Sequence, residues 1–126
     1  REKKCCKIFG YVEDVAPMLG KAHIFVLPSW YREGLPRCLL EAAASGLAII
    51  TTDVVGCRDV VKNENGILIP THDPKSLARA IEGLLNNKSQ VEFMGRKSRE
   101  YAMEKWSNRV IFAKLKSLYV DLLQSK

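Results

Sequence analysis

Histidine and long apolar runs are scarce in this sequence of 126 residues, and its cysteines lack the pattern of a disulfide scaffold or a metal site. The four cysteines, at positions 5, 6, 38 and 57, have neither the paired spacing of metal ligands nor the density of a secreted disulfide scaffold, and only two histidines could assist them. We therefore expect no metal site and a reducing, cytoplasmic location. The most apolar stretch, residues 39–50, is interrupted by Glu41 and Ser45 and is far shorter than the ~20 residues of a membrane-spanning helix.

Low-complexity segments are also missing, and the composition is that of an ordinary globular domain. Hydrophobic residues make up 47% and charged residues 27%, which suits one compact domain with a buried core. The net charge of +6 favours anionic partners, but the lysines and arginines are scattered and not interleaved with aromatic residues, so we expect no nucleic-acid binding. The chain opens without an initiator methionine or signal peptide, and we expect further chain to precede it.

Short apolar segments alternate with helical patterns through about the first 70 residues. We expect strands at the apolar runs 5–10, 23–27, 47–51 and 67–69. We expect helices at 13–21, 36–44 and 58–62. Strands that are apolar throughout and are joined by helices predict a parallel sheet covered by helices, because parallel crossovers lie over the sheet faces. The fold class is therefore α/β.

The last part of the chain has the pattern of three helices. Asp73 caps the first, Ser89 and Glu92 have the spacing of a capping box for the second, and the second ends near Trp106. Ser107 caps the last helix, whose apolar side chains fall on one face. Those side chains are Ile111, Leu115, Leu118 and Leu122. We predict one domain over 1–126, with an α/β part over about 1–70 and a helical part over about 73–126.

A charged segment follows the strand at 23–27, at the sheet edge where ligands of open parallel sheets bind. Glu33 comes just before a helix N-terminus, Glu41 lies within that helix, and Gly34 leaves room for close approach. Amides at a helix start lack intrahelical partners and suit a diphosphate. A rise of 1.5 Å per residue puts Glu41 about 7.5 Å beyond Pro36. A nucleotide sugar laid across this turn would have its sugar near Glu33 and its ribose near Glu41.

The same segment resembles a known family. Glu33 and Glu41 match the E-x7-E signature of retaining GT-B glycosyltransferases of the family 4 type, the glycosyl transferases group 1. Residues 22–29 resemble the A-D-x-x-x-x-P-S strand of that family, with His23 in place of the usual Asp. Three further matches are residues 41–46 to E-A-M-A-x-G, residues 65–70 to N-G-x-L-V-P, and residues 106–107 to the S-W region with its order reversed. The likeness covers almost the whole chain.

The resemblance implies the truncated C-terminal half of a GT-B fold, with a Rossmann-like parallel sheet, helices on both faces and a helical C-terminus. It implies that Glu33 contacts the donor sugar and stabilises the reacting centre, and that Glu41 binds ribose. The other donor-binding residues that it implies are Gly34, Leu35, Pro36, Gly10 and Tyr11. Arg37 and Gly56 are further candidates, although Gly56-Cys57-Arg58-Asp59 departs from the G-G-x-x-E of many relatives. The substrate would be a UDP- or GDP-linked sugar, with no cofactor.

By the same resemblance, the parent enzyme transfers a hexose or related sugar to a polysaccharide, lipid-linked or other acceptor, in the cytoplasm or at the cytoplasmic face of the membrane. The acceptor domain and two central strands of the donor domain have no counterpart in this sequence, so we expect the chain alone to be inactive. We expect either that the 5–10 strand moves beside 23–27 or that two chains associate through the exposed edge. The alternative is a noncatalytic, receiver- or flavodoxin-like interaction module.

Several of these residues have a structural interpretation as well as a functional one. Trp30 and Tyr31 either form a stacking wall for a sugar or pack under a neighbouring helix. Arg37 is interpreted as an exposed residue of a first helical turn and His23 as structural. Cys38 and Cys57 are interpreted as small buried hydrophobic residues.

Overall fold

Three parallel strands form the centre of the fold. The computed structural model describes residues 5–31 and 34–125. Within them the sheet order is β1 (Ile24–Leu27), β2 (Ala48–Thr52) and β3 (Gly66–Ile69), with both pairs parallel. The strands fall within a residue of the apolar runs expected at 23–27, 47–51 and 67–69. The α/β fold class is confirmed.

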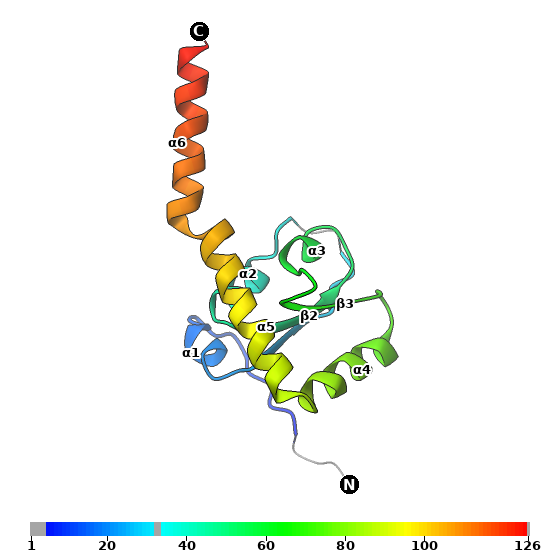
Figure 1. Cartoon of the computed structure of the whole chain (residues 1–126). Coiled ribbons are helices and arrows are strands. Elements are labelled where there is room, and N and C mark those ends of the chain that lie inside the picture. The colour runs from blue at the N-terminus through cyan, green and yellow to red at the C-terminus, as the bar shows by residue number, and fades with distance from the viewer. Residues whose placement is uncertain (1–4, 32–33, 126) are drawn as a thin grey trace.

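Helices cover both faces of this sheet, as predicted (Figure 1). Side chains alternate along β2, so Ile49 belongs to the core beneath α2 (Arg37–Ala44) and α3 (Cys57–Val60). Ala48 and Ile50 belong to the core beneath α4 (Pro74–Leu85) and α5 (Lys88–Tyr101). All five residues of β2 are buried, because this strand is central and covered on both faces. Burial on both faces explains why the sequence of β2 does not alternate between apolar and charged residues.

Two glycines let α5 cross close to the end of α2. Gly46 follows the C-cap of α2 with a φ of 75°, the left-handed conformation that commonly ends a helix at glycine. Gly95 of α5 lies against the Gly46 backbone so tightly that a Cβ at Gly95 would collide with the Gly46 carbonyl oxygen. This contact anchors α5 beside the amino end of β2.

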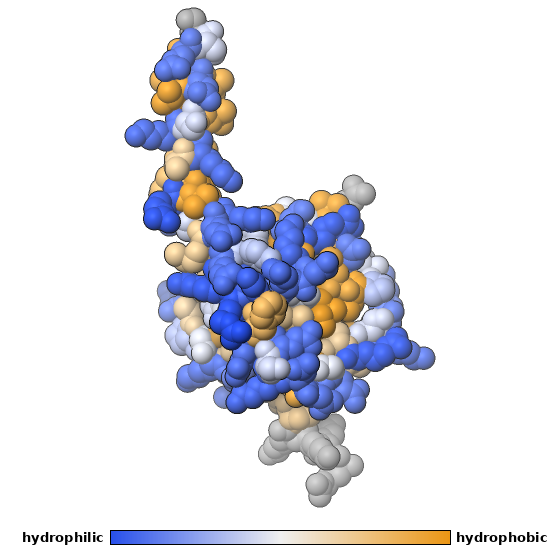
Figure 2. All heavy atoms as spheres, in the orientation of Figure 1, coloured by the Kyte–Doolittle hydropathy of each residue, from blue (hydrophilic) through white to orange (hydrophobic). Residues whose placement is uncertain are grey.

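Side-chain caps begin the C-terminal helices. Asp73 caps α4 and Ser107 caps α6 (Asn108–Gln124), as the sequence predicts. Between α5 and α6 the chain forms one π-helical segment, η1 (Ala102–Trp106), so the helical run ends at the predicted Trp106. α6 then extends away from the rest of the structure (Figure 1), and none of its residues is buried. Its apolar side chains form orange patches on this projecting helix in Figure 2.

The predicted cap of α5 and the predicted strand at 5–10 are both wrong. The capping box expected from Ser89 and Glu92 is replaced by an Asn87 cap, whose side chain accepts the Gln90 amide, because α5 begins at Lys88, one residue before Ser89. Residues 5–10 form no strand and do not close the sheet beside β1. They are exposed, so an apolar run without a paired neighbour does not adopt strand structure here.

Candidate functional site

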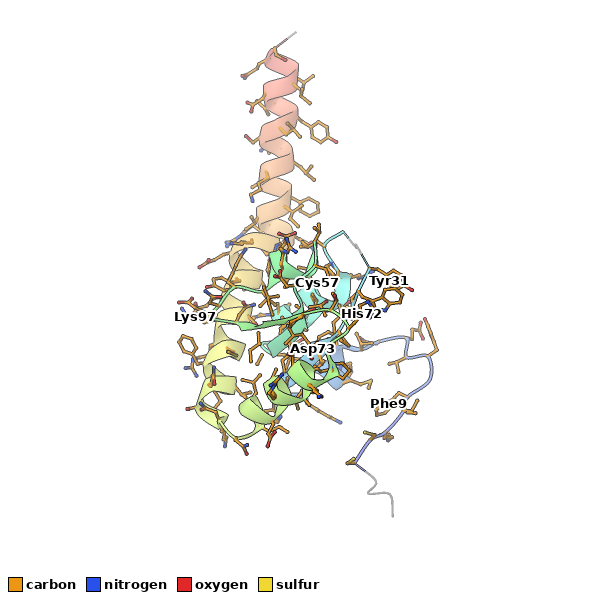
Figure 3. All side chains as sticks on the ribbon, turned by 90° about the vertical axis from the view of Figure 1, so that its right-hand side faces the viewer. Phe9, Tyr31, Cys57, His72, Asp73 and Lys97 are labelled. Carbon is orange, nitrogen blue, oxygen red and sulfur yellow. The ribbon has the colours of Figure 1, made fainter. Side chains whose placement is uncertain are left out.

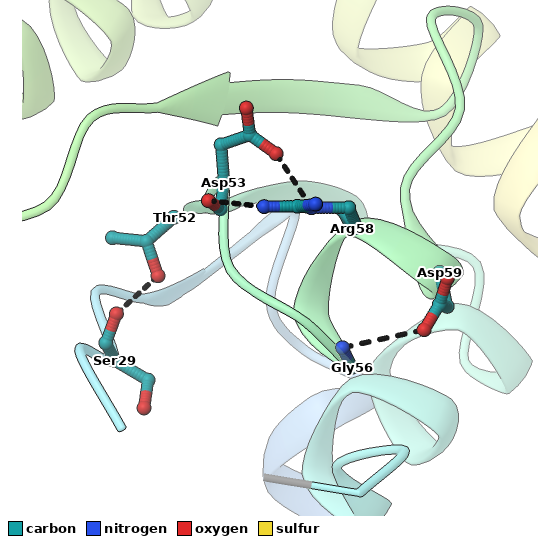
Figure 4. Close-up of polar contacts among 6 residues, drawn as sticks. All are labelled: Ser29, Thr52, Asp53, Gly56, Arg58 and Asp59. Carbon is teal, nitrogen blue, oxygen red and sulfur yellow. Dashed lines mark hydrogen bonds and ion pairs between the residues drawn. The ribbon is translucent and has the colours of Figure 1, made fainter. Parts of the chain in front are cut away.

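The carboxyl ends of all three strands meet at one edge of the sheet, because the strands are parallel. Two threonines at the end of β2 hold the segment that follows β1. The Thr51 hydroxyl donates to the Leu27 carbonyl at 2.7 Å, and the Thr52 hydroxyl donates to the Ser29 carbonyl (Figure 4). Both threonine side chains are buried, and the two hydrogen bonds are partly shielded from water. The loop that leads to α2 therefore starts from a fixed position.

The start of α2 is built around a buried proline. Pro36 is the N-cap, not a residue of the first turn, and its carbonyl accepts the amides of Leu39 and Leu40 at 3.1 and 3.2 Å. Gly34 precedes it with nothing among the described atoms within 4 Å of an added Cβ. Packing inside the described chain therefore does not require glycine at this position. Because α2 follows β1, its N-terminus, the positive end of the helix dipole, lies at the carboxyl edge of the sheet.

Arg37 and Glu41 lie one turn apart on α2 and form an ion pair. The Arg37 Nε is 3.6 Å from the Glu41 Oε1. Arg37 is exposed, as interpreted from the sequence, whereas the Glu41 side chain is 40% exposed. Glu41 also lines a cavity of about 210 Å³ together with Val15, Met18, Leu19, Phe25 and Cys38, next to the short helix α1 (Ala16–Leu19). Arg37 therefore contacts the Glu41 carboxylate from one side, and the rest of the Glu41 side chain is partly accessible to solvent.

The remaining predicted donor residues belong to two different segments of the chain. Glu33 lies outside the described residues. Leu35 is exposed immediately before Pro36. Gly10 and Tyr11 lie in the irregular segment that precedes α1, and Tyr11 is 91% exposed. Gly34, Leu35, Pro36 and Glu41 lie at the start of α2 and within it, whereas Gly10 and Tyr11 belong to a separate segment before α1.

A second turn at the same edge joins β2 to α3. Gly56 has a φ of 91° and its amide donates to the Asp59 carboxylate at 3.2 Å (Figure 4). Arg58 holds Asp53, with 2.9 Å between Nε and Oδ1 and a further bond from its guanidinium to the Asp53 carbonyl. The Gly56 amide is thus already paired within the chain. A phosphate that used it would have to replace Asp59.

An aromatic cluster lies at the carboxyl ends of β1 and β3. The sequence motifs do not predict it. The rings of Trp30 and Tyr31 stack with centroids 4.4 Å apart, and the Trp30 ring lies 5.2 Å from the His72 ring at 54°. Figure 3 shows Tyr31 and His72 beside each other, with Asp73 nearby at the start of α4. Trp30 and Tyr31 do not pack under a helix, since both are more than half exposed. In the sequence, the only indication that His72 could belong to a site is its place shortly after the strand expected at 67–69.

Asp73, next to this cluster, has a structural role as the N-cap of α4. Its carboxylate accepts the Ser76 hydroxyl at 2.7 Å and the Ser76 amide at 3.0 Å. These hydrogen bonds, the hydroxyl first, lower the pKa of Asp73 because they favour its charged form. Asp73 is therefore a charged helix cap.

Two other residues have structural surroundings. His23 precedes β1 at the amino end of the sheet, opposite the site, and its carbonyl accepts the Ala48 amide at 3.2 Å. Cys57 is fully buried in the core beneath α2, as predicted, whereas Cys38 is half-buried. Among the described residues, no helix combines the length and apolar character needed to cross a bilayer.

Comparison with known proteins identifies relatives of this chain. Residues 1–87 match the family model described as "Glycosyl transferases group 1". The chain is 34% identical over 118 residues to the capsular polysaccharide biosynthesis glycosyltransferase CapM of Staphylococcus aureus, covering 93% of this chain and 31% of that protein. It is 31% identical to the UDP-Gal:alpha-D-GlcNAc-diphosphoundecaprenol alpha-1,3-galactosyltransferase of Escherichia coli, covering 98% of this chain and 32% of that protein.

A solved structure has the same fold. Sucrose-phosphate synthase from Thermosynechococcus elongatus superposes with a TM-score of 0.82 at 28% identity, covering 89% of this chain and 28% of that chain. The chain thus spans about a third of the length of the curated relatives that it matches.

Proposed function

This chain belongs to the glycosyl transferases group 1 family of GT-B glycosyltransferases, and we propose that it binds the nucleoside-diphosphate-sugar donor of a retaining glycosyltransferase. The observation that carries the proposal is the start of α2 at the carboxyl edge of a parallel sheet, with Glu41 one turn into the helix. Such an edge is where open α/β sheets bind ligands. The family membership gives no support to the alternative of a receiver- or flavodoxin-like module.

The donor would lie along α2 in the order of its own groups. The diphosphate takes the helix N-terminus, where the dipole and the first amides favour an anion. Gly34 allows the ligand to approach the backbone, which agrees with the free space around an added Cβ. The ribose hydroxyls donate to the half-exposed Glu41 carboxylate. Glu33, outside the described residues, contacts the sugar.

The reaction of the whole protein would be transfer of a hexose or related sugar. Charge develops on the leaving diphosphate, and the helix N-terminus stabilises it electrostatically without a metal. Glu33 holds the sugar ring as positive charge develops on it. The E. coli relative is named for a UDP-linked sugar, and UDP is therefore the first nucleotide to test.

The acceptor and the location are further parts of the proposal. The E. coli relative is named for a diphosphoundecaprenol-linked acceptor, and the S. aureus relative for capsular polysaccharide. We place the parent protein in the cytoplasm, at the membrane face when the acceptor is lipid-linked. The net charge of +6 favours an anionic lipid surface. Because the chain spans about a third of its relatives, we expect no transfer activity from these residues alone.

Ligand-observed NMR with UDP, GDP and ADP tests the donor site on the chain as it is. We expect weak, saturable binding of one nucleoside diphosphate and a loss of about tenfold or more in the Glu41→Ala variant, since a charged acceptor of two hydroxyls is removed. Glu82→Ala on α4 is the matched control, because Glu82 is an exposed glutamate on the other face of the sheet. Equal affinities of wild type and Glu41→Ala for every nucleotide would contradict the proposal.

A further inference from the structure

A second cavity lies at the same edge of the sheet, and none of its lining belongs to α2. It has a volume of about 240 Å³ and opens where all three strands end. Trp30 lines it from the segment after β1, Thr52 from the end of β2, and His72 from the segment after β3. The rest of the lining consists of apolar residues and one carboxylate: Pro28, Ile69, Pro70, Pro74, Leu77 and Asp73. It is separate from the cavity at Glu41, with which it shares no residue.

The indole ring of Trp30 forms an aromatic wall of the cavity, and Tyr31 packs against this ring. Trp30 is 56% exposed and stacks on Tyr31, whose ring is 4.4 Å away and is not part of the lining. Tyr31 therefore supports the indole while the indole borders the cavity. His72 adds a second ring 5.2 Å from the Trp30 ring, tilted by 54°. The two rings form a corner that is open to solvent.

The backbone holds His72 in this corner. His72 is a non-glycine residue with a φ of 54°, in the left-handed region, between Pro70 at the end of β3 and the Asp73 cap of α4. Asp73 is committed to Ser76 through two hydrogen bonds and Thr52 to the Ser29 carbonyl. Besides these side-chain oxygens, which already have partners but can accept further hydrogen bonds, the polar side-chain groups of the lining residues are the imidazole of His72 and the indole N–H of Trp30.

We propose that this cavity binds one pyranose ring of a saccharide, as a sugar subsite separate from the nucleotide site. The C–H face of a pyranose packs on an aromatic face, and its hydroxyl groups reach hydrogen-bonding groups at the rim. A nucleobase also stacks on aromatic rings, but its edge needs several donors and acceptors in one plane. Most of this lining is proline, isoleucine and leucine, and the Asp73 carboxylate and the Thr52 hydroxyl already have partners within the chain. The inference rests on the proposed function, because a sugar-transferring protein needs to hold a saccharide beside the donor.

Tryptophan fluorescence gives a direct readout of this cavity. Trp30 and Trp106 are the two tryptophans of the chain, so the Trp106→Phe variant makes the emission specific for Trp30. Methyl α-D-glucopyranoside, methyl α-D-galactopyranoside and N-acetylglucosamine are the probes, and uridine tests the nucleobase alternative. We expect a saturable change with at least one saccharide, in the millimolar range typical of a single ring. A response to uridine alone, or to no saccharide up to its solubility limit, would overturn the inference.

Variants separate the subsite from nonspecific binding, with ligand-observed NMR as a readout that does not depend on tryptophan. Trp30→Ala should abolish saccharide binding, Trp30→Phe should retain part of it because the aromatic face remains, and His72→Ala should weaken it by about tenfold. Tyr119→Ala on α6 is the matched control, since it removes another exposed aromatic ring away from the cavity. Equal loss in Trp30→Ala and Tyr119→Ala would count against a specific site.

These measurements test the nucleotide site and the sugar subsite separately. Trp30→Ala should leave UDP binding unchanged, and Glu41→Ala should leave saccharide binding unchanged, because the two cavities share no lining residue. Saccharide binding without any nucleotide binding would remove the proposed donor function and keep the sugar subsite. Nucleotide binding without saccharide binding would do the reverse.

Discussion

Arg37 and Glu41 face each other across one turn of α2, with 3.6 Å between the Arg37 Nε and the Glu41 Oε1. The pair is exposed on the arginine side, so it contributes little to stability in water. The ion pair instead orients the Glu41 side chain, because the carboxylate proposed to bind ribose has the Arg37 guanidinium beside it before a ligand binds. A ligand whose hydroxyls approach Glu41 can keep or displace this weak pair at little cost.

Replacing Arg37 by Ala should therefore change nucleotide binding less than replacing Glu41. We expect about a threefold loss of nucleoside diphosphate affinity at low salt, which shrinks as salt rises because the interaction is exposed and screened. Titration at low and high ionic strength measures this, with Arg37→Lys as the charge-preserving control. A loss as large as that of Glu41→Ala, independent of salt, would instead make Arg37 a direct phosphate ligand.

The cap of α4 should make thermal stability depend on pH. The pKa of Asp73 is held below its ordinary value of 3.8 by the Ser76 hydroxyl and amide, so the folded chain favours the charged carboxylate. A lowered folded pKa gives stability that is present above the unfolded pKa and is lost as pH falls through the folded pKa. Asp73→Ala should lower the melting temperature at neutral pH and reduce this acid dependence. Asp73→Asn is the control.

Asn can still cap the helix but cannot ionise, so Asp73→Asn should retain more stability than Asp73→Ala while losing the pH dependence. Melting curves of the three proteins from about pH 7 to about pH 3 make the comparison. Identical pH profiles of wild type and Asp73→Asn would show that Asp73 is not the group responsible.

Gly95→Ala should destabilise the chain strongly. The added Cβ would collide with the Gly46 carbonyl oxygen, and since that atom belongs to the backbone and cannot rotate away, α5 would have to move away from the end of α2. We expect a loss of about 1–3 kcal/mol in the free energy of unfolding, the cost of an overpacked contact. Gly83→Ala in α4 is the matched control, because its Cβ meets nothing and helix propensity should stabilise it by about 0.5–1 kcal/mol. Urea unfolding of both variants measures the difference, and equal effects would contradict the collision.

Much of this fold was predictable because its signals are local. Apolar strands such as 47–51 and caps such as Asp73 depend on neighbouring residues, and the structure places them as predicted. The segment 5–10 has a similar apolar pattern but forms no strand, because strand formation needs a partner that the described chain does not supply. The Asn87 cap was missed because Ser89, two residues later, has an equally suitable side chain.

The site was predictable to the extent that its residues are close in sequence. Gly34, Pro36 and Glu41 lie on one loop and one helix, so spacing alone brings them together. Trp30 and His72 meet only because two parallel strands end at the same edge, and the left-handed backbone of His72 has no sequence signature. The sugar subsite was therefore accessible only from the structure.

In the full-length protein that contains this chain, Glu33→Gln should lower the turnover number by orders of magnitude while changing KM little. The substitution keeps the size and hydrogen-bonding capacity of the side chain but removes a charge proposed to act on the developing positive sugar. Initial-rate measurements with the donor sugar test this, with Glu82→Gln as control. An unchanged turnover number would remove Glu33 from the catalytic assignment.

The open edge of β1 should promote association between copies of the isolated chain. Within the described residues β1 pairs with β2 alone, and segment 5–10 does not cover its other side. An uncovered strand edge presents unpaired amides and carbonyls to another chain. We therefore expect the isolated chain to associate reversibly, with a sedimentation coefficient that rises with concentration.

Hydrogen–deuterium exchange locates the contact. Amides of β1 on the open side should exchange fast at low concentration and slow down as chains associate, whereas β2 amides, paired on both sides, should be protected throughout. The β2 strand is thus an internal control for folding. If association slows exchange in the apolar helix α6 and leaves β1 unchanged, the exposed face of α6 is the contact and the sheet edge is not. A chain that stays monomeric at all concentrations would show that the β1 edge does not recruit a partner.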